Sequence, residues 1–155
     1  MKIYISTSWK NRLLVRKLAE ILRSHVHEVF DFTDPSCRKT YEAPQEMFPE
    51  LFDPSQHIYS QYINREEWQA AVNENREAIK WADLIILLLP CGIDATADWA
   101  LGVGMGKRTI IVGHPNKGER SEVHLWADVM LDSIDDIIPW FQSYKFDELL
   151  LNRQL

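Results

Sequence analysis

The hydrophobic and polar positions follow two different periods along most of the chain. Short, nearly continuous apolar runs such as residues 84–89 are typical of strands buried on both faces of a parallel sheet. Other segments carry apolar residues three or four positions apart, as in Leu14, Leu18 and Leu22, which is the spacing of an amphipathic helix. The pattern predicts strands at residues 2–6, 27–32, 84–89, 109–112 and 129–131, and helices at 11–23, 66–81, 94–105 and 134–144.

This alternation of strands and helices predicts an α/β fold. We expect a single domain, residues 1–155, with an open, doubly wound sheet of five mostly parallel strands in the order 2-1-3-4-5 and helices on both faces. The stretch at about 36–64 contains three prolines and no clean period, and we expect a long lid-like insertion there. Such a sheet binds ligands beyond the carboxyl ends of its strands where the strand order reverses, here between the first and third strands.

Two polar segments follow the first and third predicted strands. The residues that they bring to this edge are Ser6, Ser8, Trp9, Gly92 and Asp94. Asp98 lies one helical turn beyond Asp94, so both carboxylates share one face of the predicted helix near its N-terminus. They either stabilise a developing cationic sugar carbon or cap the helix and interact with its dipole, and position alone leaves both interpretations open.

Composition narrows the class of partner. The chain has 17 basic and 23 acidic residues, a net charge of −6, and no basic stripe, so neither a nucleic acid polymer nor a membrane surface is an expected partner. The longest apolar run is far shorter than the roughly 20 residues of a membrane span. Cys37 and Cys91 form no CxxC pair, which favours reduced thiols and a cytoplasmic location. The five histidines show no metal-ligand spacing, and we expect neither a metal nor a cofactor.

One segment resembles a known family. Residues 81–107, WADLIILLLPCGIDATADWALGVGMGK, resemble the nucleoside 2-deoxyribosyltransferase-like superfamily, in which an apolar strand and a short polar loop precede a helix with an acidic nucleophile, small residues and Gly-Lys. The opening KIYIS and the later HEVFDF are similar to the same family's start. The resemblance implies a flavodoxin-like fold and cleavage of the N-glycosidic bond of a nucleoside or nucleotide. In that chemistry a carboxylate forms a covalent glycosyl intermediate, and the sugar then passes to another base or to water.

The resemblance also implies roles for individual residues. Asp98 matches the nucleophile, where the family usually has glutamate. Asn75 matches a second family carboxylate that handles the base or its proton; an amide is no general acid or base, but it can hydrogen-bond a base edge. Related enzymes complete their sites with residues of a neighbouring subunit, so a homo-oligomer is expected. Candidate residues for that contact are Trp126, Trp140 and Phe141.

Four further residues lie near the expected site. Three of them have two interpretations, and the role of Ser6 is implied by resemblance alone. Resemblance brings Tyr4 and Ser6 of the first strand to the substrate, and Tyr4 is otherwise a core aromatic residue with a paired hydroxyl. Asp31, at the end of the second strand, either binds a sugar hydroxyl or caps the turn at residues 33–35. Trp9 either stacks on a base or packs against the protein.

These residues leave three classes of function open. The first is an enzyme in which Asp98 is the nucleophile and Asn75 orients the base. The second is a non-catalytic module of the same fold that binds or senses a nucleotide-like ligand, which the departures at positions 98 and 75 favour. A flavin-dependent reductase ranks last, because residues 6–8 offer hydroxyls but no glycine to cradle a phosphate.

Overall fold

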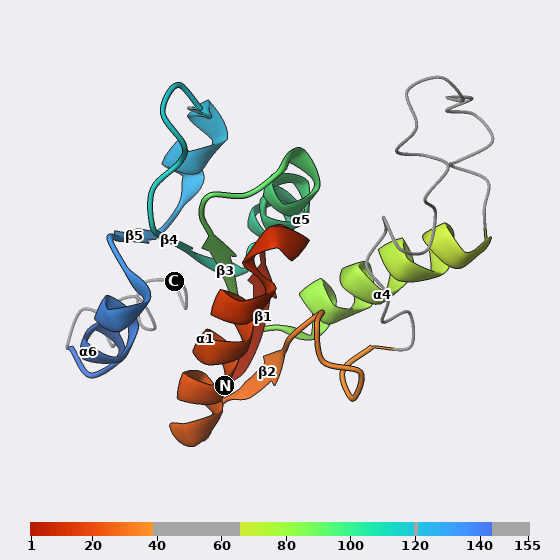
Figure 1. Cartoon of the computed structure of the whole chain (residues 1–155), viewed down its shortest axis with the longest axis horizontal. Helices are drawn as coiled ribbons and strands as arrows, with labels where there is room; N and C mark the ends of the chain where they lie inside the picture. Colours follow the sequence, from red (N-terminus) through yellow and green to blue (C-terminus); the bar gives the residue numbers. More distant parts are fainter. Residues whose placement is uncertain (39–65, 120, 144–155) are drawn as a thin grey trace.

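The computed structural model describes residues 1–38, 66–119 and 121–143, and within them the chain forms a sheet of five parallel strands (Figure 1). The order β2-β1-β3-β4-β5 and the α/β class expected from the sequence are both confirmed. Most of the insertion expected at about 36–64 lies outside the described residues. The strands are β1 (Lys2–Ser6), β2 (Glu28–Phe30), β3 (Leu84–Leu88), β4 (Arg108–Val112) and β5 (Val129–Leu131).

Helices cover both faces of this sheet and make a three-layer arrangement (Figure 1). On one face lie α1 (Arg12–Ser24), η4 (Ile134–Asp136) and α6 (Ile137–Phe141). On the other face lie α4 (Glu66–Trp81) and α5 (Ile93–Gly104). Two further 3-10 turns, η1 (Trp9–Asn11) and η3 (Glu122–Trp126), precede α1 and β5 respectively.

The alternation of side chains along β1 decides which residues meet which helix layer. Ile3 and Ile5 are fully buried in the core under α1, whereas Tyr4 belongs to the core shared with α4 and α5. Successive residues of a strand point to opposite faces, so Ser6 points to the same face as Tyr4. The hydroxyls of β1 therefore reach the layer that contains α4 and α5.

Two element boundaries differ from the sequence prediction for local reasons. The second strand ends at Phe30 rather than at residue 32, because the Asp31 carboxylate accepts hydrogen bonds at 2.7 Å from both the backbone N–H and the hydroxyl of Thr33 and closes a turn. The closing helix begins as a 3-10 turn, since Ser133 and Asp136 form a capping box that fixes its start.

The aromatic residues expected at a subunit contact do not share one surface. Trp140 is 8% exposed and belongs to the core under α1 and α6, so the expectation that it faces a neighbouring subunit is wrong. Phe141 is partly buried against the same core. The periodicity of α6 turns Trp140 toward the sheet together with Ile137. Trp126 remains 56% exposed on η3.

Candidate functional site

The side chain of Asp98 meets two others from distant parts of the chain, beside the carboxyl end of β1. The Tyr4 hydroxyl donates a hydrogen bond to Oδ2 of Asp98 at 2.9 Å, and Nδ2 of Asn75 donates to the same oxygen at 3.0 Å. Tyr4 comes from β1, Asn75 from α4 and Asp98 from α5. The structure thus brings together the two residues expected to be catalytic and one of those expected to bind substrate, a set called here the Asp98 cluster.

The position of α5, and with it Asp98, is fixed at two points. The Ser6 hydroxyl donates a 2.9 Å hydrogen bond to the backbone carbonyl of Ala95, one turn before Asp98. Further along the helix, Gly102 approaches β3 so closely that a Cβ at this position would lie 2.7 Å from Cγ1 of Ile85. Because Ile85 is fully buried, only glycine lets the helix lie this deep. Ser6 therefore orients the helix that carries Asp98.

The two oxygens of Asp98 have different surroundings. Oδ2 accepts both hydrogen bonds of the cluster, whereas Oδ1 accepts none from the described residues. Asp98 as a residue is half-buried, and its Oδ1 is not fully enclosed. One oxygen is therefore held by donors while the other keeps its lone pairs available.

Burial dominates the protonation of the cluster. Desolvation raises the pKa of the Asp98 carboxyl above its usual value, and the nearby Asp94 charge adds to this rise. The hydrogen bonds from Tyr4 and Asn75 and the Arg38 charge act in the opposite direction on that pKa without cancelling the effect of burial. Burial, followed by the negative charge of Asp98, raises the pKa of Tyr4 well above its usual value, so Tyr4 remains a hydrogen-bond donor.

The side-chain amide of Asn75 has its nitrogen engaged and its oxygen unpaired among the described residues. A carboxylate oxygen that already accepts from Tyr4 can only accept from Asn75 as well, which places Nδ2 toward Asp98. The amide oxygen Oδ1 is then buried without a hydrogen-bond partner among the described residues. Such an acceptor costs about 1–3 kcal/mol when it stays unpaired, so a donor on a bound ligand would recover stability at this position.

Arg38 and Glu74 form a charged pair beside the cluster that sequence reasoning missed. Nε of Arg38 lies 3.4 Å from Oε2 of Glu74, and the Arg38 side chain is only 7% exposed. Glu74 directly precedes Asn75 on α4, and the Arg38 charge lowers the pKa of both Tyr4 and Asp98. Arg38 follows β2 in a segment without periodicity, so no pattern in the sequence indicated it.

A second polar group joins the ends of β1 and β3. The Thr7 hydroxyl donates to the Leu88 carbonyl at 2.7 Å, and Nδ2 of Asn11 donates to Thr7 Oγ1 at 2.9 Å and to the Pro90 carbonyl at 2.7 Å. Asn11 occupies the N-cap position of α1, but its side chain makes no capping hydrogen bond there. These bonds hold the loop before α5 against the end of β1.

Three expected substrate contacts lie along the same edge of the sheet but outside the cluster. Gly92 is the exposed N-cap residue of α5, and Asp94 is exposed in its first turn. Oγ of Ser8 accepts a 3.3 Å hydrogen bond from the backbone of Lys10 and caps η1. All three remain candidates for contact with a ligand at the carboxyl edge.

Trp9 and Asp31 are engaged elsewhere. The Trp9 ring packs edge-on against Phe32, with 5.0 Å between ring centroids, on the face of the sheet that α1 covers. Asp31 is 1% exposed, and its carboxylate is occupied by the Thr33 turn. Within the described residues neither side chain contacts the Asp98 cluster, and the geometry corresponds to packing for Trp9 and turn capping for Asp31.

Neither a metal-ion site nor a membrane-spanning helix is present in residues 1–38, 66–119 and 121–143. No group of three or more His, Cys, Asp or Glu side chains in these ranges is arranged to hold a metal ion. None of the helices in the same ranges has the length and apolar character needed to cross a bilayer.

Comparison with known proteins shows a similarity at the level of the fold. No protein-family model matches the chain, and no curated protein matches it. Among solved structures, the chain is similar to the 2-deoxyribosyltransferase from the psychrotolerant bacterium Bacillus psychrosaccharolyticus, with a TM-score of 0.57 and 18% sequence identity. The similarity covers 88% of this chain and 90% of that chain. At such low identity it shows a shared fold, and the chemistry has to be argued from the side chains.

Proposed function

We propose that this chain cleaves the N-glycosidic bond of a nucleoside or nucleotide, or transfers the sugar to another base, with Asp98 as the nucleophile. The observation that carries the proposal is the difference between the two oxygens of Asp98. Oδ2 is held by Tyr4 and Asn75, whereas Oδ1 accepts no hydrogen bond from the described residues and is not fully enclosed. A nucleophilic carboxylate requires this arrangement, because one oxygen must be oriented while the other attacks.

The reaction can be written with the residues of the cluster. Oδ1 forms a bond to the anomeric carbon as the bond from that carbon to the base nitrogen breaks. The departing base keeps the bonding electrons and takes a proton from solvent. A second base or a water molecule then attacks the same carbon, releases the carboxylate and loses its proton. In both transition states the negative charge of Asp98 stabilises the positive charge that develops on the sugar.

Tyr4 and Asn75 act on this step through Asp98. Their hydrogen bonds keep Oδ2 in place and favour the ionised carboxylate against the effect of burial on the Asp98 pKa. Asn75 supplies no proton to the base, because an amide is not an acid in this pH range. Its open Oδ1 can accept a hydrogen bond from a ligand. The fold of a 2-deoxyribosyltransferase supports a nucleoside as the ligand.

A second candidate function is a non-catalytic module that binds a nucleotide-like ligand. One observation favours it: Asn75 is an amide and no acid, and the Tyr4 hydroxyl is already donated to Asp98, so neither donor of the cluster is free to protonate a leaving base. Both candidates use the same small-molecule ligand class. A homo-oligomer remains part of the proposal, with the exposed Trp126 as its candidate contact.

Release of free base separates the two functions. Purified protein is incubated with a panel of purine and pyrimidine nucleosides, deoxynucleosides and their 5′-phosphates, with and without a second base, and the products are resolved by chromatography. We expect free or exchanged base with the parent protein and at least a hundredfold lower rate with Asp98→Ala. Glu20→Gln, at an exposed position of α1 on the opposite face, is the matched control and should behave as the parent. Binding without any release would contradict the enzymatic function and favour the binding module.

A further inference from the structure

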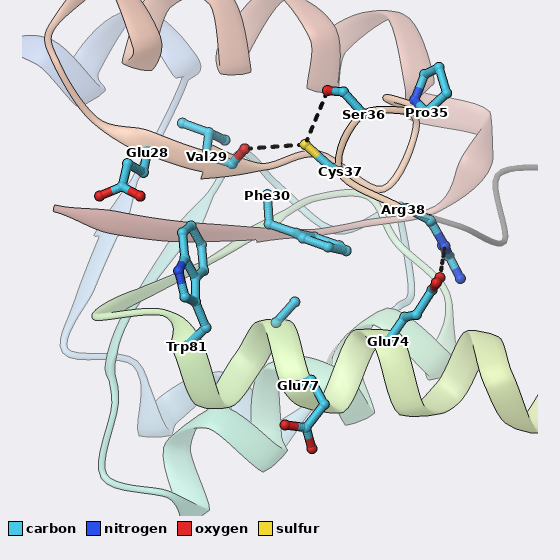
Figure 2. Close-up of a pocket in the computed structure, with 11 residues that line it drawn as sticks. Glu28, Val29, Phe30, Pro35, Ser36, Cys37, Arg38, Glu74, Glu77 and Trp81 are labelled. Atoms are coloured by element: carbon cyan, nitrogen blue, oxygen red, sulfur yellow. Dashed lines mark hydrogen bonds and ion pairs between the residues drawn. The ribbon is translucent and has the colours of Figure 1, made fainter.

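A hollow of about 1000 Å³ lies between β2 and α4 (Figure 2). Its volume is at the upper end of the range, about 300–1000 Å³, that is usual for small-molecule sites. Tyr4, Asn75 and Asp98 are not among the residues that line it. The volume is therefore additional to the space that a sugar would occupy at Asp98.

The hollow adjoins the cluster at two points. The Phe30 ring, which lines the hollow, stacks on the Tyr4 ring with 5.5 Å between centroids and 23° between ring planes. Glu74, also in the lining, directly precedes Asn75 on α4. The Tyr4–Phe30 ring pair and the step from Glu74 to Asn75 on α4 therefore join the hollow to the cluster.

The chemistry of the lining selects apolar groups. Phe30, Ala78 and Trp81 supply aliphatic and aromatic surface between the strand and the helix. Figure 2 shows the Phe30 and Trp81 rings on the two sides of the hollow. Among the described residues of the lining, the charged ones are three glutamates and Arg38, and the Arg38 guanidinium is already paired with Glu74 at 3.4 Å. A phosphate or polyphosphate arm would meet more negative than positive charge here, whereas an uncharged ring or alkyl group would bury apolar area.

We propose that this hollow receives an apolar substituent carried by the base of the nucleoside whose sugar lies at Asp98, so that base-modified nucleosides are the preferred ligands. This inference rests on the proposed function, since it takes the sugar position from Asp98. Phe30 and Trp81 contact the substituent, and Phe30 links its position to Tyr4 and the nucleophile. An unmodified nucleoside leaves the hollow filled with water.

Binding of matched ligand pairs tests the inference. Asp98→Asn, which cannot form the glycosyl ester, keeps the ligands intact during isothermal titration calorimetry. The ligands are 2′-deoxyadenosine with and without a benzyl group on N6 or on C8, and 2′-deoxyuridine with and without a phenyl group on C5. We expect at least one substituted nucleoside to bind at least tenfold more tightly than its parent. Equal or weaker binding of all three would overturn the inference.

Variants that fill or open the hollow test whether the gain in affinity from the substituent arises there. Ala78→Leu, made in the Asp98→Asn background, projects a larger side chain into the hollow and should abolish the gain from the substituent while leaving binding of the parent nucleoside unchanged. Ala70→Leu adds the same atoms at an exposed position of the same helix and should keep the gain. If thermal unfolding shows that Ala78→Leu does not fold, Trp81→Ala takes its place and should reduce the gain at least fivefold. A gain that survives in the folded variant would overturn the inference.

Base release by the parent protein keeps the two proposals distinguishable. A tenfold gain in binding without any base release supports the hollow as a substituent site and contradicts the enzymatic function. Base release from unmodified nucleosides without any gain from the substituents supports the enzymatic function and overturns the role given to the hollow.

Discussion

Tyr4 and Asp98 are 94 positions apart in the sequence, yet the tyrosine hydroxyl lies 2.9 Å from Oδ2 of the aspartate. The contact joins an inner strand of the sheet to the helix that follows β3. It orients one carboxylate oxygen, and the hydrogen bond from Asn75 goes to that same oxygen, so the other accepts none from the described residues. Four predictions test this arrangement and the packing that supports it.

Removing the hydroxyl of Tyr4 should destabilise the ionised form of the Asp98 carboxyl relative to its protonated form. The hydrogen bond from Tyr4 lowers the pKa of Asp98, so in Tyr4→Phe that pKa should rise further. Base release depends on the carboxylate, so its rate should increase with pH through the Asp98 pKa, and this rise should occur at higher pH in the variant. A hydrogen bond to a charged group contributes about 1.5–3 kcal/mol, which corresponds to a shift of about one to two pH units in the rise of the rate. The pH–rate profile, or a ¹³C NMR titration of the Asp98 carboxyl if no base is released, gives the measurement. An unshifted titration would show that Tyr4 has no effect on Asp98.

Asp98 should destabilise the fold as the pH rises. Its pKa is higher in the folded than in the unfolded chain, so between these two values the folded state binds more protons. The stability that Asp98 contributes is therefore fully present below its pKa in the unfolded chain, and it is lost as the pH rises through its pKa in the folded chain. Asp98→Asn carries no charge, so it should melt at a higher temperature than the parent at pH 7, and the difference should disappear at acidic pH. A variant that is less stable than the parent at both pH values would contradict this sign.

Placing a carboxylate at position 75 should give the Asp98 cluster an acid. In Asn75→Asp the new carboxyl lies beside Oδ2 of Asp98, about where Nδ2 now lies at 3.0 Å, and two carboxylates this close share a proton. A shared proton near neutral pH can be given to the departing base, and general acid catalysis contributes about 10²–10⁴-fold. We expect base release to increase by at least tenfold, with Asn75→Leu as the control that removes the hydrogen bond without adding an acid. A decrease in both variants would mean that the amide itself is required.

The close packing of α5 on β3 should tolerate no side chain at Gly102. The Cβ of Gly102→Ala would lie 2.7 Å from Cγ1 of the fully buried Ile85, so the helix or the isoleucine must shift. We expect a loss of about 1–3 kcal/mol in the free energy of unfolding, measured with urea, together with a lower rate of base release because Asp98 moves with the helix. Gly104→Ala is the matched control in the same helix, since a Cβ there has no atom within 4 Å. Equal stability of the two variants would show that the close approach is not a constraint.

Hydrophobic periodicity was sufficient to predict the sheet. The apolar runs of β1, β3 and β4 and the helical spacing between them reflect burial, which acts on every residue of an element, so the strand order followed from general rules of α/β folds. The residues of the Asp98 cluster could also be predicted from the sequence. Helical spacing placed Asp98 near the N-terminus of α5, and resemblance supplied Asn75 and Tyr4.

Contacts set by single side chains were not predictable in the same way. Asp31 and Trp9 follow strands as ligand-binding residues do, but a local turn and the Phe32 ring engage them. Arg38 follows β2 without any pattern, and its pairing with Glu74 depends on how α4 lies against the sheet. The hollow beside Phe30 likewise depends on the distance between two elements, which periodicity does not encode.

The place of β1 between β2 and β3 has a consequence for how the protein is made. The Thr7 hydroxyl bonds to the Leu88 carbonyl, 81 positions later, so during translation β1 has to remain unpaired on that side until β3 has left the ribosome. A buried central strand with one open edge is prone to pair with other chains in this interval. Slow synthesis before β3 should therefore lower the yield of soluble protein, even though it changes no residue of the mature fold.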